Sequence, residues 1–189
     1  TQLMLGDRGS ARASAEKAVG IDSNLGRTQS VLGFTALAEM DTASARAAFE
    51  QAIALDASDP MSHLGRGLAK IRQGELAEGR ADIEAAVALA SNNALLRAYL
   101  GKAYFEEKRS PLDATQLEVA KELDPLDPTS YFYNAIRLQT ENRPVEALRE
   151  LEAAMERNDN RAVYRSRLLL DQDRAARGTS LARIYNDLG

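Results

Sequence analysis

The stretch Ala45–Pro60, ARAAFEQAIALDASDP, reads as an amphipathic helix followed by a stop. Ala45, Phe49 and Ala52 recur at the spacing that places side chains on one face of a helix. Pro60 ends the pattern, because it has no N–H to donate and disfavours helical backbone in the residue before it. The stretch therefore predicts a helix that buries one face against a neighbour.

The same pattern returns every 34 residues along the chain. A large apolar residue holds one position of the cycle, an alanine follows three residues later, and a small residue stands sixteen residues earlier. The large residues are Phe49, Ile83, Leu117 and Leu151, the alanines are Ala52, Ala86, Ala120 and Ala154, and the small residues are Gly33, Gly67, Gly101 and Ala135. Three series in step over four cycles indicate an array of repeats.

The period sets the expected boundaries. The chain divides into a partial repeat at 1–25, full repeats at 26–59, 60–93, 94–127 and 128–161, and an irregular segment at 162–189 with a truncated or capping helix. Together these are predicted to form a single domain. Each repeat should contain two helices, and the first helix of 26–59 is expected at about residues 28–39.

Turn and cap residues mark where the expected helices begin and end. Asp41 is a plausible N-cap for the second helix of its repeat, and Gly74 is expected in the turn of the next. Pro111 and Pro144 are expected in the first turn of the second helices of their repeats, where a missing N–H costs nothing.

The composition favours a folded, helical and soluble protein. Of the 189 residues, 44% are apolar and the formal net charge is −4. Val, Thr and aromatic residues are sparse, which favours helix over strand. The absence of cysteine excludes disulfides, and no apolar run approaches the roughly 18 residues of a membrane span. No signal peptide is visible, Thr1 indicates a processed or excised piece, and nothing identifies a compartment.

A 34-residue helix–turn–helix period with small residues at fixed places resembles the tetratricopeptide repeat (TPR). Counted from residues 26, 60, 94 and 128, position 8 is Gly or Ala, position 24 is large and apolar, and position 27 is always Ala. The departures are His63, Arg97 and Tyr131 at position 4, Arg66 and Asn134 at position 7, and Asp113 at position 20. The resemblance implies an all-α, right-handed superhelical solenoid of hairpins, and we expect a bacterial source.

The resemblance also implies a binding surface. In this family the first helices of the hairpins line a concave groove, and positions 2, 5, 9, 12 and 13 point into it. The predicted peptide-binding residues are Phe34, Leu64, Leu68, Ile71, Lys102, Phe105, Phe132 and Ile136. This set is mostly apolar and lacks the Lys and Asn pair with which some members hold a C-terminal carboxylate. It predicts a scaffold that binds an apolar or amphipathic segment of a protein or peptide, unless these residues are interhelical core.

Other classes of function lack support in the sequence. There is no phosphate loop, no dinucleotide-binding glycine pattern and no G-x-S-x-G, so we predict no enzymatic activity and no cofactor. His63 is the sole histidine and is expected to pack rather than to bind a metal. The acidic net charge argues against a nucleic-acid partner for the six tyrosines.

The C-terminal segment leaves two alternatives open. Leu181, Ile184, Tyr185 and Leu188 recur at the spacing of an apolar helical stripe. The stripe could fold back as a cap, which we favour, or pair with another copy in a homodimer. The alternative function is therefore self-assembly within a larger protein. Residues 165–189 also resemble a junction in large bacterial envelope proteins, which would make that parent protein envelope-associated.

Overall fold

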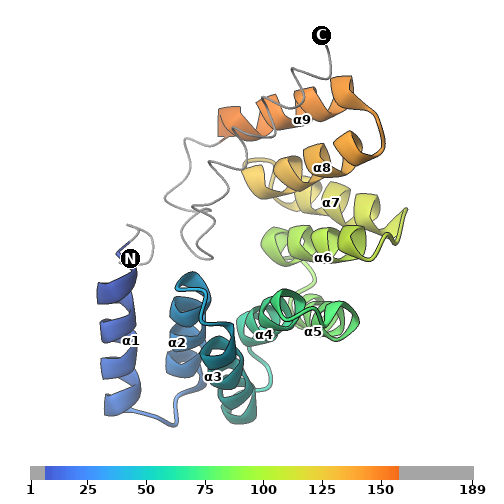
Figure 1. The fold of residues 1–189 in the computed structure, drawn as a ribbon. Helices are drawn as coiled ribbons and strands as arrows, with labels where there is room; N and C mark the ends of the chain where they lie inside the picture. The colour runs from blue at the N-terminus through green and yellow to red at the C-terminus, as the bar shows by residue number, and fades with distance from the viewer. Residues whose placement is uncertain (1–6, 158–189) are drawn as a thin grey trace. The chain divides into compact units, whose positions relative to one another are not determined.

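The computed structural model describes residues 7–157, which form α-helices joined by short turns (Figure 1). Their bounds are α1 (Arg8–Ile21), α2 (Gly26–Ala38), α3 (Thr42–Leu55), α4 (Pro60–Arg72), α5 (Leu76–Leu89), α6 (Ala94–Glu106), α7 (Leu112–Leu123), α8 (Pro128–Thr140) and α9 (Pro144–Glu156). The described residues contain no strand. Each 34-residue period holds one hairpin, so the all-α helical-repeat solenoid fold is confirmed.

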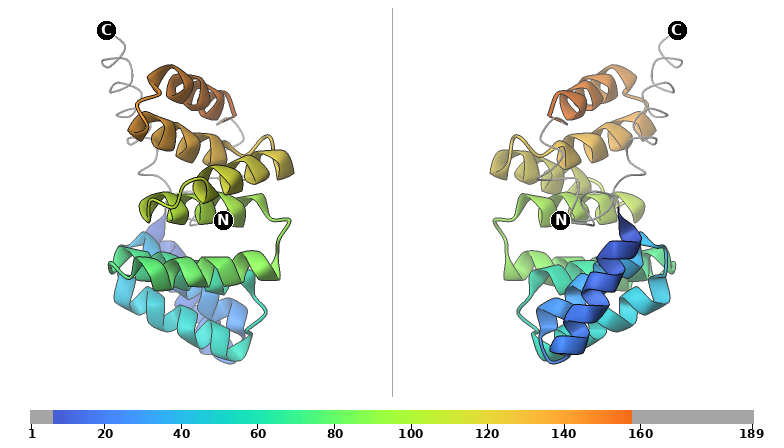
Figure 2. Two further views of the ribbon diagram at one scale, coloured as in Figure 1. Left: turned by 90° about the vertical axis from the view of Figure 1, so that its right-hand side faces the viewer. Right: turned by 90° about the vertical axis from the view of Figure 1, so that its left-hand side faces the viewer.

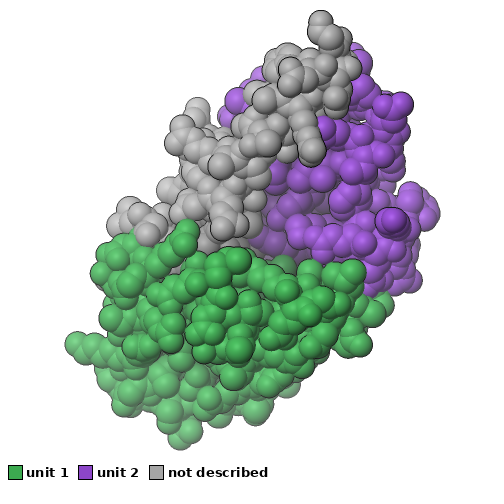
Figure 3. Space-filling view, in the orientation of Figure 1, with its two compact units in different colours: residues 1–91 green, residues 92–189 purple. Residues whose placement is uncertain are grey.

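The chain falls into two compact units, one ending at Ser91 and the other beginning at Asn92 (Figure 3). In the first unit the hairpins α2–α3 and α4–α5 pack side by side through α3 and α4, and α1 packs against α2. The first helices α2 and α4 also contact each other directly. This is the packing of a repeat stack, in which each hairpin buries its apolar face against the next.

The second unit repeats this arrangement with two hairpins, α6–α7 and α8–α9. Helix α7 packs against α8, and the first helices α6 and α8 contact each other. The four helices, coloured green to orange, lie one above another in both side views of Figure 2. No helix in residues 7–157 is long and apolar enough to span a membrane.

Carboxylate and amide side chains cap many of the helices. The Asp41 carboxylate accepts from the backbone N–H of Ser44 at 3.2 Å, so its predicted role as N-cap of α3 is confirmed. The first helices α4, α6 and α8 are each capped by the residue at position 34 of the preceding repeat. These capping residues are Asp59, Asn93 and Asp127. Pro144 begins α9 as predicted, but Pro111 does not lie in the first turn of α7. It precedes the helix at the N-cap, because α7 begins one residue later at Leu112.

Every hairpin turns through one residue with left-handed backbone at position 15 of its repeat. These residues are Met40, Gly74, Lys108 and Asn142, with φ of 66°, 88°, 56° and 58°. In each turn the next residue donates its N–H to a carbonyl five residues back, as Asp41 does to Ala36 at 3.0 Å. This is the hydrogen bond with which a Schellman motif closes a helix. Gly74 therefore lies in the turn, as predicted.

The repeated apolar and small residues form the core. The large residues at position 24 and the alanines at position 27 are all at most 1% exposed: Phe49, Ile83, Leu117, Leu151, Ala52, Ala86, Ala120 and Ala154. Phe49 shows why the small residues are needed. A Cβ on Gly33 would lie 2.7 Å from its ring, and one on Gly65 in the next hairpin would lie 2.2 Å away. One aromatic side chain thus fills the space that two glycines leave open.

Several predictions fall outside the described residues. The irregular segment 162–189, the apolar stripe at Leu181, Ile184, Tyr185 and Leu188, and the junction at 165–189 belong to residues that the structure does not describe. The cap and the homodimer therefore both remain predictions.

Candidate functional site

The eight predicted peptide-binding residues differ in how far they reach the surface. Phe34, Leu64 and Phe132 are buried, with exposed fractions of 9%, 0% and 2%. The other five are partly exposed: Leu68, Ile71, Lys102, Phe105 and Ile136. Only these five offer side-chain surface to a partner, and the buried three support the first helices from within.

Aromatic packing accounts for two of the buried residues. The ring of Phe34 meets the ring of Phe49 edge to face, with centroids 4.8 Å apart, so it joins α2 to α3. The ring of Phe132 lies beside that of Tyr133, with centroids 5.7 Å apart. Tyr133 in turn contacts Tyr99 of α6 at 5.8 Å. These contacts place Phe34 and Phe132 in the core, the alternative that the sequence left open.

In the first unit the partly exposed residues lie on α4. Leu68 and Ile71 are three residues apart and therefore share one face of this helix. Arg72 follows them, and its Nη1 donates to the backbone carbonyl of Leu37 at 2.6 Å. This bond fixes the end of α4 against the end of α2, so the apolar pair is held on a rigid part of the hairpin stack.

In the second unit the partly exposed residues lie on α6 and α8. The ammonium of Lys102 pairs with Glu106 at 2.5 Å and lies 5.8 Å from the ring centroid of Tyr133 on α8. Phe105 follows Lys102 by three residues on α6, and Ile136 lies on α8. This face combines apolar side chains with a lysine that is already paired, which suits an amphipathic partner better than a strongly charged one.

A second surface lies in the same unit, where α7, α8 and α9 enclose a hollow of about 330 Å³. Its lining residues are Glu118, Tyr131, Asn134, Arg137, Leu138, Arg143, Glu146, Arg149, Glu150 and Ala153. On α8 the hollow uses positions 131, 134, 137 and 138, which lie on the opposite side of the helix from Phe132 and Ile136. It is therefore separate from the predicted peptide-binding face.

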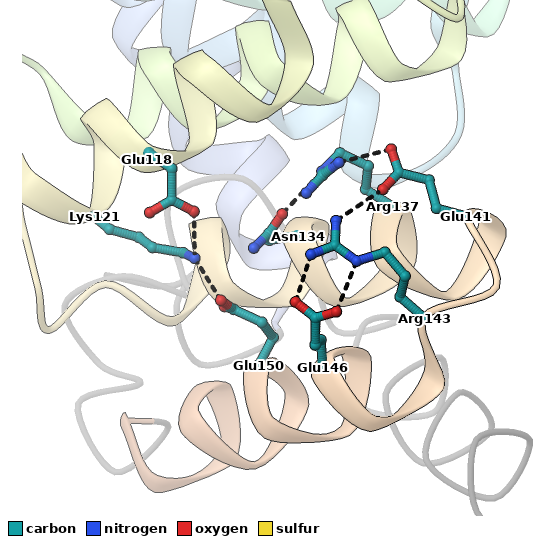
Figure 4. Close-up of polar contacts among 8 residues, drawn as sticks. All are labelled: Glu118, Lys121, Asn134, Arg137, Glu141, Arg143, Glu146 and Glu150. Carbon is teal, nitrogen blue, oxygen red and sulfur yellow. Dashed lines mark hydrogen bonds and ion pairs between the residues drawn. The ribbon is translucent and has the colours of Figure 1, made fainter. Parts of the chain in front are cut away.

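One end of the hollow holds two carboxylates and one ammonium. Lys121 Nζ donates to Glu118 Oε1 at 2.9 Å and to Glu150 Oε1 at 2.7 Å, as the left side of Figure 4 shows. The second oxygen of Glu150, Oε2, is buried and has no hydrogen-bond partner among the described residues. A buried carboxylate oxygen without a donor is costly, so a further donor that reached Glu150 Oε2 would remove this cost.

The other end is an internally balanced network of two arginines and two glutamates, seen on the right of Figure 4. Arg137 is 8% exposed and donates to Glu141 at 2.7 Å and to the side-chain oxygen of Asn134 at 3.0 Å. Arg143 pairs with Glu146 at 2.5 Å and with Glu141 at 3.3 Å. The hydrogen bonds from Arg143 hold the pKa of Glu146 below its usual value.

None of the hollow's residues was predicted as a site from the sequence. The signal that could have found it is the departure of Asn134 from the apolar pattern at position 7, sixteen residues before Glu150. The same spacing joins Arg66 to Asp82 two repeats earlier.

No group of metal-ligating side chains occurs among residues 7–157. His63 is half-buried and its Nε2 lies 2.9 Å from the carbonyl oxygen of Ala57, which agrees with the packing role expected for it.

Neither a protein-family model nor a curated protein matches the chain. Solved structures do match, and those described here, at 16–18% identity, show the fold alone. Cut9, in the APC/C hetero-tetramer Cut9–Hcn1, superposes with a TM-score of 0.87 at 16% identity. The match covers 99% of this chain and 35% of Cut9, so this chain spans about a third of the length of Cut9. TTC0263, a thermophilic TPR protein of Thermus thermophilus, gives 0.79 at 18% identity over 94% of this chain and 92% of that one.

YrrB, a TPR protein with an unusual peptide-binding site, gives a TM-score of 0.59 at 17% identity over 84% of this chain and 83% of that one. These likenesses confirm the TPR fold. The bacterial source stays a prediction.

Proposed function

We propose that this chain is a protein-interaction scaffold whose first helices bind an apolar or amphipathic segment of a partner. The observation that carries the proposal is that the first helices of each unit carry partly exposed residues, on α4 in the first unit and on α6 and α8 in the second, set on hairpins with buried cores. A rigid framework with apolar side chains at its surface suits binding, because little ordering entropy is lost when a partner docks. The unusual peptide-binding site of YrrB belongs to that protein and supports only the class of function.

The five exposed residues have different roles in this proposal. Leu68 and Ile71 would contact apolar side chains of the partner from α4. Phe105 would do so from α6 as an aromatic anchor, and Ile136 would do so from α8. Lys102 would orient the partner through its aliphatic stem and ammonium. The proposal assigns a binding role and no catalytic step.

Selection from a random peptide library displayed on phage tests the proposal, because it does not require the natural partner to be identified first. Peptides selected on the wild-type chain should be rich in apolar residues. Their affinity, measured by fluorescence anisotropy, should fall by about tenfold or more in Leu68→Glu. Leu89→Glu is the matched control, because Leu89 is 46% exposed at the end of α5 and lies on no first helix. Equal affinity for both variants would contradict the proposal.

A second candidate, self-assembly, is favoured by one observation. Helix α9 is the last described helix, and its Val145 and Met155 are 51% and 46% exposed. Exposed apolar residues at the end of a repeat stack are a route to association between copies. Sedimentation velocity at increasing protein concentration separates the two candidates. A concentration-dependent dimer that Val145→Glu converts to a monomer would favour assembly.

A further inference from the structure

At the hollow between α7, α8 and α9, Asn134 stands where the equivalent position of the first unit has an arginine. In the hairpin α4–α5, the carboxylate of Asp82 is surrounded by donors. Arg66 donates to both of its oxygens, through Nε at 2.8 Å and Nη2 at 2.6 Å. Lys70 Nζ lies 2.8 Å from Asp82 Oδ2. Asp82 is only 7% exposed, and both of its carboxylate oxygens are paired.

Two repeats later the same positions hold different residues. Glu150 stands where Asp82 stands, Asn134 replaces Arg66, and Leu138 replaces Lys70. Asn134 is much shorter than an arginine, and it uses its side-chain oxygen to accept from Arg137. The long side chain that Arg66 places beside Asp82 therefore has no counterpart at position 134 beside Glu150.

The second carboxylate at the hollow, that of Glu118, also has no arginine at the equivalent position. In the first unit Glu50, at position 25 of its repeat, pairs with Arg46 on the same helix at 3.0 Å. In the second unit position 25 is Glu118, and the residue four earlier is Ala114. Lys121 is the shared partner of both Glu118 and Glu150. Two carboxylates thus share one ammonium, and Glu150 Oε2 is left without a donor among the described residues.

We propose that this hollow binds the guanidinium group of an arginine on a partner peptide, with Glu150 and Glu118 as its carboxylate ligands. A guanidinium is flat and presents several N–H donors, so it can reach Glu150 Oε2 and Glu118 together, as Arg66 reaches both oxygens of Asp82. The ring of Tyr131 lines the hollow, and its centroid lies 4.2 Å from the guanidinium carbon of Arg157 and 5.1 Å from Lys121 Nζ. The volume of about 330 Å³ exceeds what one side chain needs, so flanking backbone can enter with it.

The opposite end of the hollow sets the orientation of the ligand. Arg137 and Arg143 are paired with Glu141 and Glu146, and Arg149 also lines the hollow. This end favours a backbone carbonyl over a second cation, because arginine side chains line it and a carbonyl oxygen accepts hydrogen bonds. A peptide that carries one arginine fits both ends of the hollow.

Titration of the isotope-labelled full chain with two short peptides, followed by NMR, tests the proposal. The probes are acetyl-Gly-Arg-Gly-amide and its citrulline analogue, which has nearly the same shape and no charge. The arginine peptide should shift the backbone amide signals of residues 118, 134 and 150, and the citrulline peptide should bind at least about tenfold more weakly. Agmatine, a small molecule with a guanidinium group, shows whether the hollow prefers a guanidinium group on a peptide or on a free small molecule. Weaker binding by agmatine than by the peptide supports a peptide ligand, and equal binding overturns that part of the proposal.

Three variants separate the site from a general effect of charge. Glu150→Gln should weaken binding of the arginine peptide by about tenfold or more, because a charge-assisted hydrogen bond is lost. Glu152→Gln is the matched control on an exposed face of α9 and should bind as the wild type does. Asn134→Arg restores the arginine of the earlier repeat, so it should abolish peptide binding.

Equal binding of the citrulline peptide, or no binding of either peptide to the wild type, would overturn the proposal. So would wild-type affinity in Glu150→Gln. Because Leu68 lies on α4 and does not line the hollow, Leu68→Glu should leave arginine binding unchanged. Failure of one proposal is therefore distinguishable from failure of the other.

Discussion

The backbones of Gly67 and Gly79 touch where α4 crosses α5. A Cβ on Gly67 would lie 2.6 Å from the carbonyl oxygen of Gly79, and a Cβ on Gly79 would lie 2.6 Å from the carbonyl oxygen of Gly67. Both obstacles are backbone atoms, which cannot turn aside as a side chain can. The close approach requires glycine at both positions and explains why a residue that disfavours helices occurs in two of them.

Gly79→Ala should therefore destabilise the fold. The added methyl group must push the two helices apart, and overpacking of this kind costs about 1–3 kcal/mol. Gly20→Ala is the control, because nothing lies within 4 Å of its added Cβ and alanine is the better helix former by about 0.5–1 kcal/mol. Urea denaturation measures both. A Gly79→Ala chain as stable as the wild type would show that the helices can separate freely.

At one of the left-handed turn residues, a substitution should stabilise the fold instead of destabilising it. Met40 has φ of 66° and is 57% exposed, so its side chain makes few packing contacts to offset the unfavourable backbone conformation. Met40→Gly should raise the free energy of unfolding by about 0.5–1 kcal/mol, after the greater freedom of glycine in the unfolded chain is subtracted. Gly74→Ala, at φ of 88°, should lower it. Thermal melts of the two variants should shift in opposite directions, and shifts of the same sign would contradict this account of the turns.

The ion pair between Arg66 and Asp82 should make stability depend on pH. Burial alone would raise the pKa of Asp82, but the hydrogen bonds from Arg66 and Lys70 outweigh it and hold the pKa below its usual value. A carboxyl group with a lowered pKa stabilises the fold above its unfolded pKa of about 3.9, and this stabilisation is lost as the pH falls through the folded value.

Asp82→Asn should therefore destabilise the chain at pH 7, by about 1–2 kcal/mol. The difference between wild type and variant should shrink at pH 3. Denaturation curves at the two pH values check this. A difference that stays constant from pH 7 to pH 3 would mean that the charge of Asp82 does not contribute.

Burial separates two residues that the sequence placed in the same groove. Phe132 is 2% exposed, so Phe132→Glu should bury a charge and lower stability by about 3 kcal/mol or more. Leu68 is partly exposed, so Leu68→Glu should keep the circular dichroism spectrum of the wild type. Its free energy of unfolding should lie within about 1 kcal/mol of the wild-type value. Equal collapse of both variants would place Leu68 in the core as well.

The sequence was sufficient for the repeat fold because the packing residues recur at fixed positions. Phe49 and its equivalents at position 24 are all buried, and the series of alanines at position 27 lies beside them. Turn geometry was only partly predictable. Gly74 was identified because glycine favours left-handed backbone, whereas Met40 and Lys108 adopt it without being residue types that favour it.

The candidate sites were harder to predict, since they depend on how deeply each side chain is buried and on contacts between helices. Positions 5 and 9 of a repeat lie on the same side of a helix, so periodicity alone could not separate buried Leu64 from partly exposed Leu68. The hollow near Glu150 arises from α7, α8 and α9 together. Its one sequence signal, Asn134 at position 7, gains meaning only beside the pairing of Arg66 with Asp82.

Methyl NMR of the chain bound to a peptide selected on it tests the central claim, that the first helices form the binding surface, most directly. The methyl groups of Leu68, Ile71 and Ile136 should shift or broaden as the peptide is added. Those of Leu89 and Leu123, exposed at the ends of second helices, should not. Shifts confined to Leu89 and Leu123, with Leu68, Ile71 and Ile136 unchanged, would contradict the claim.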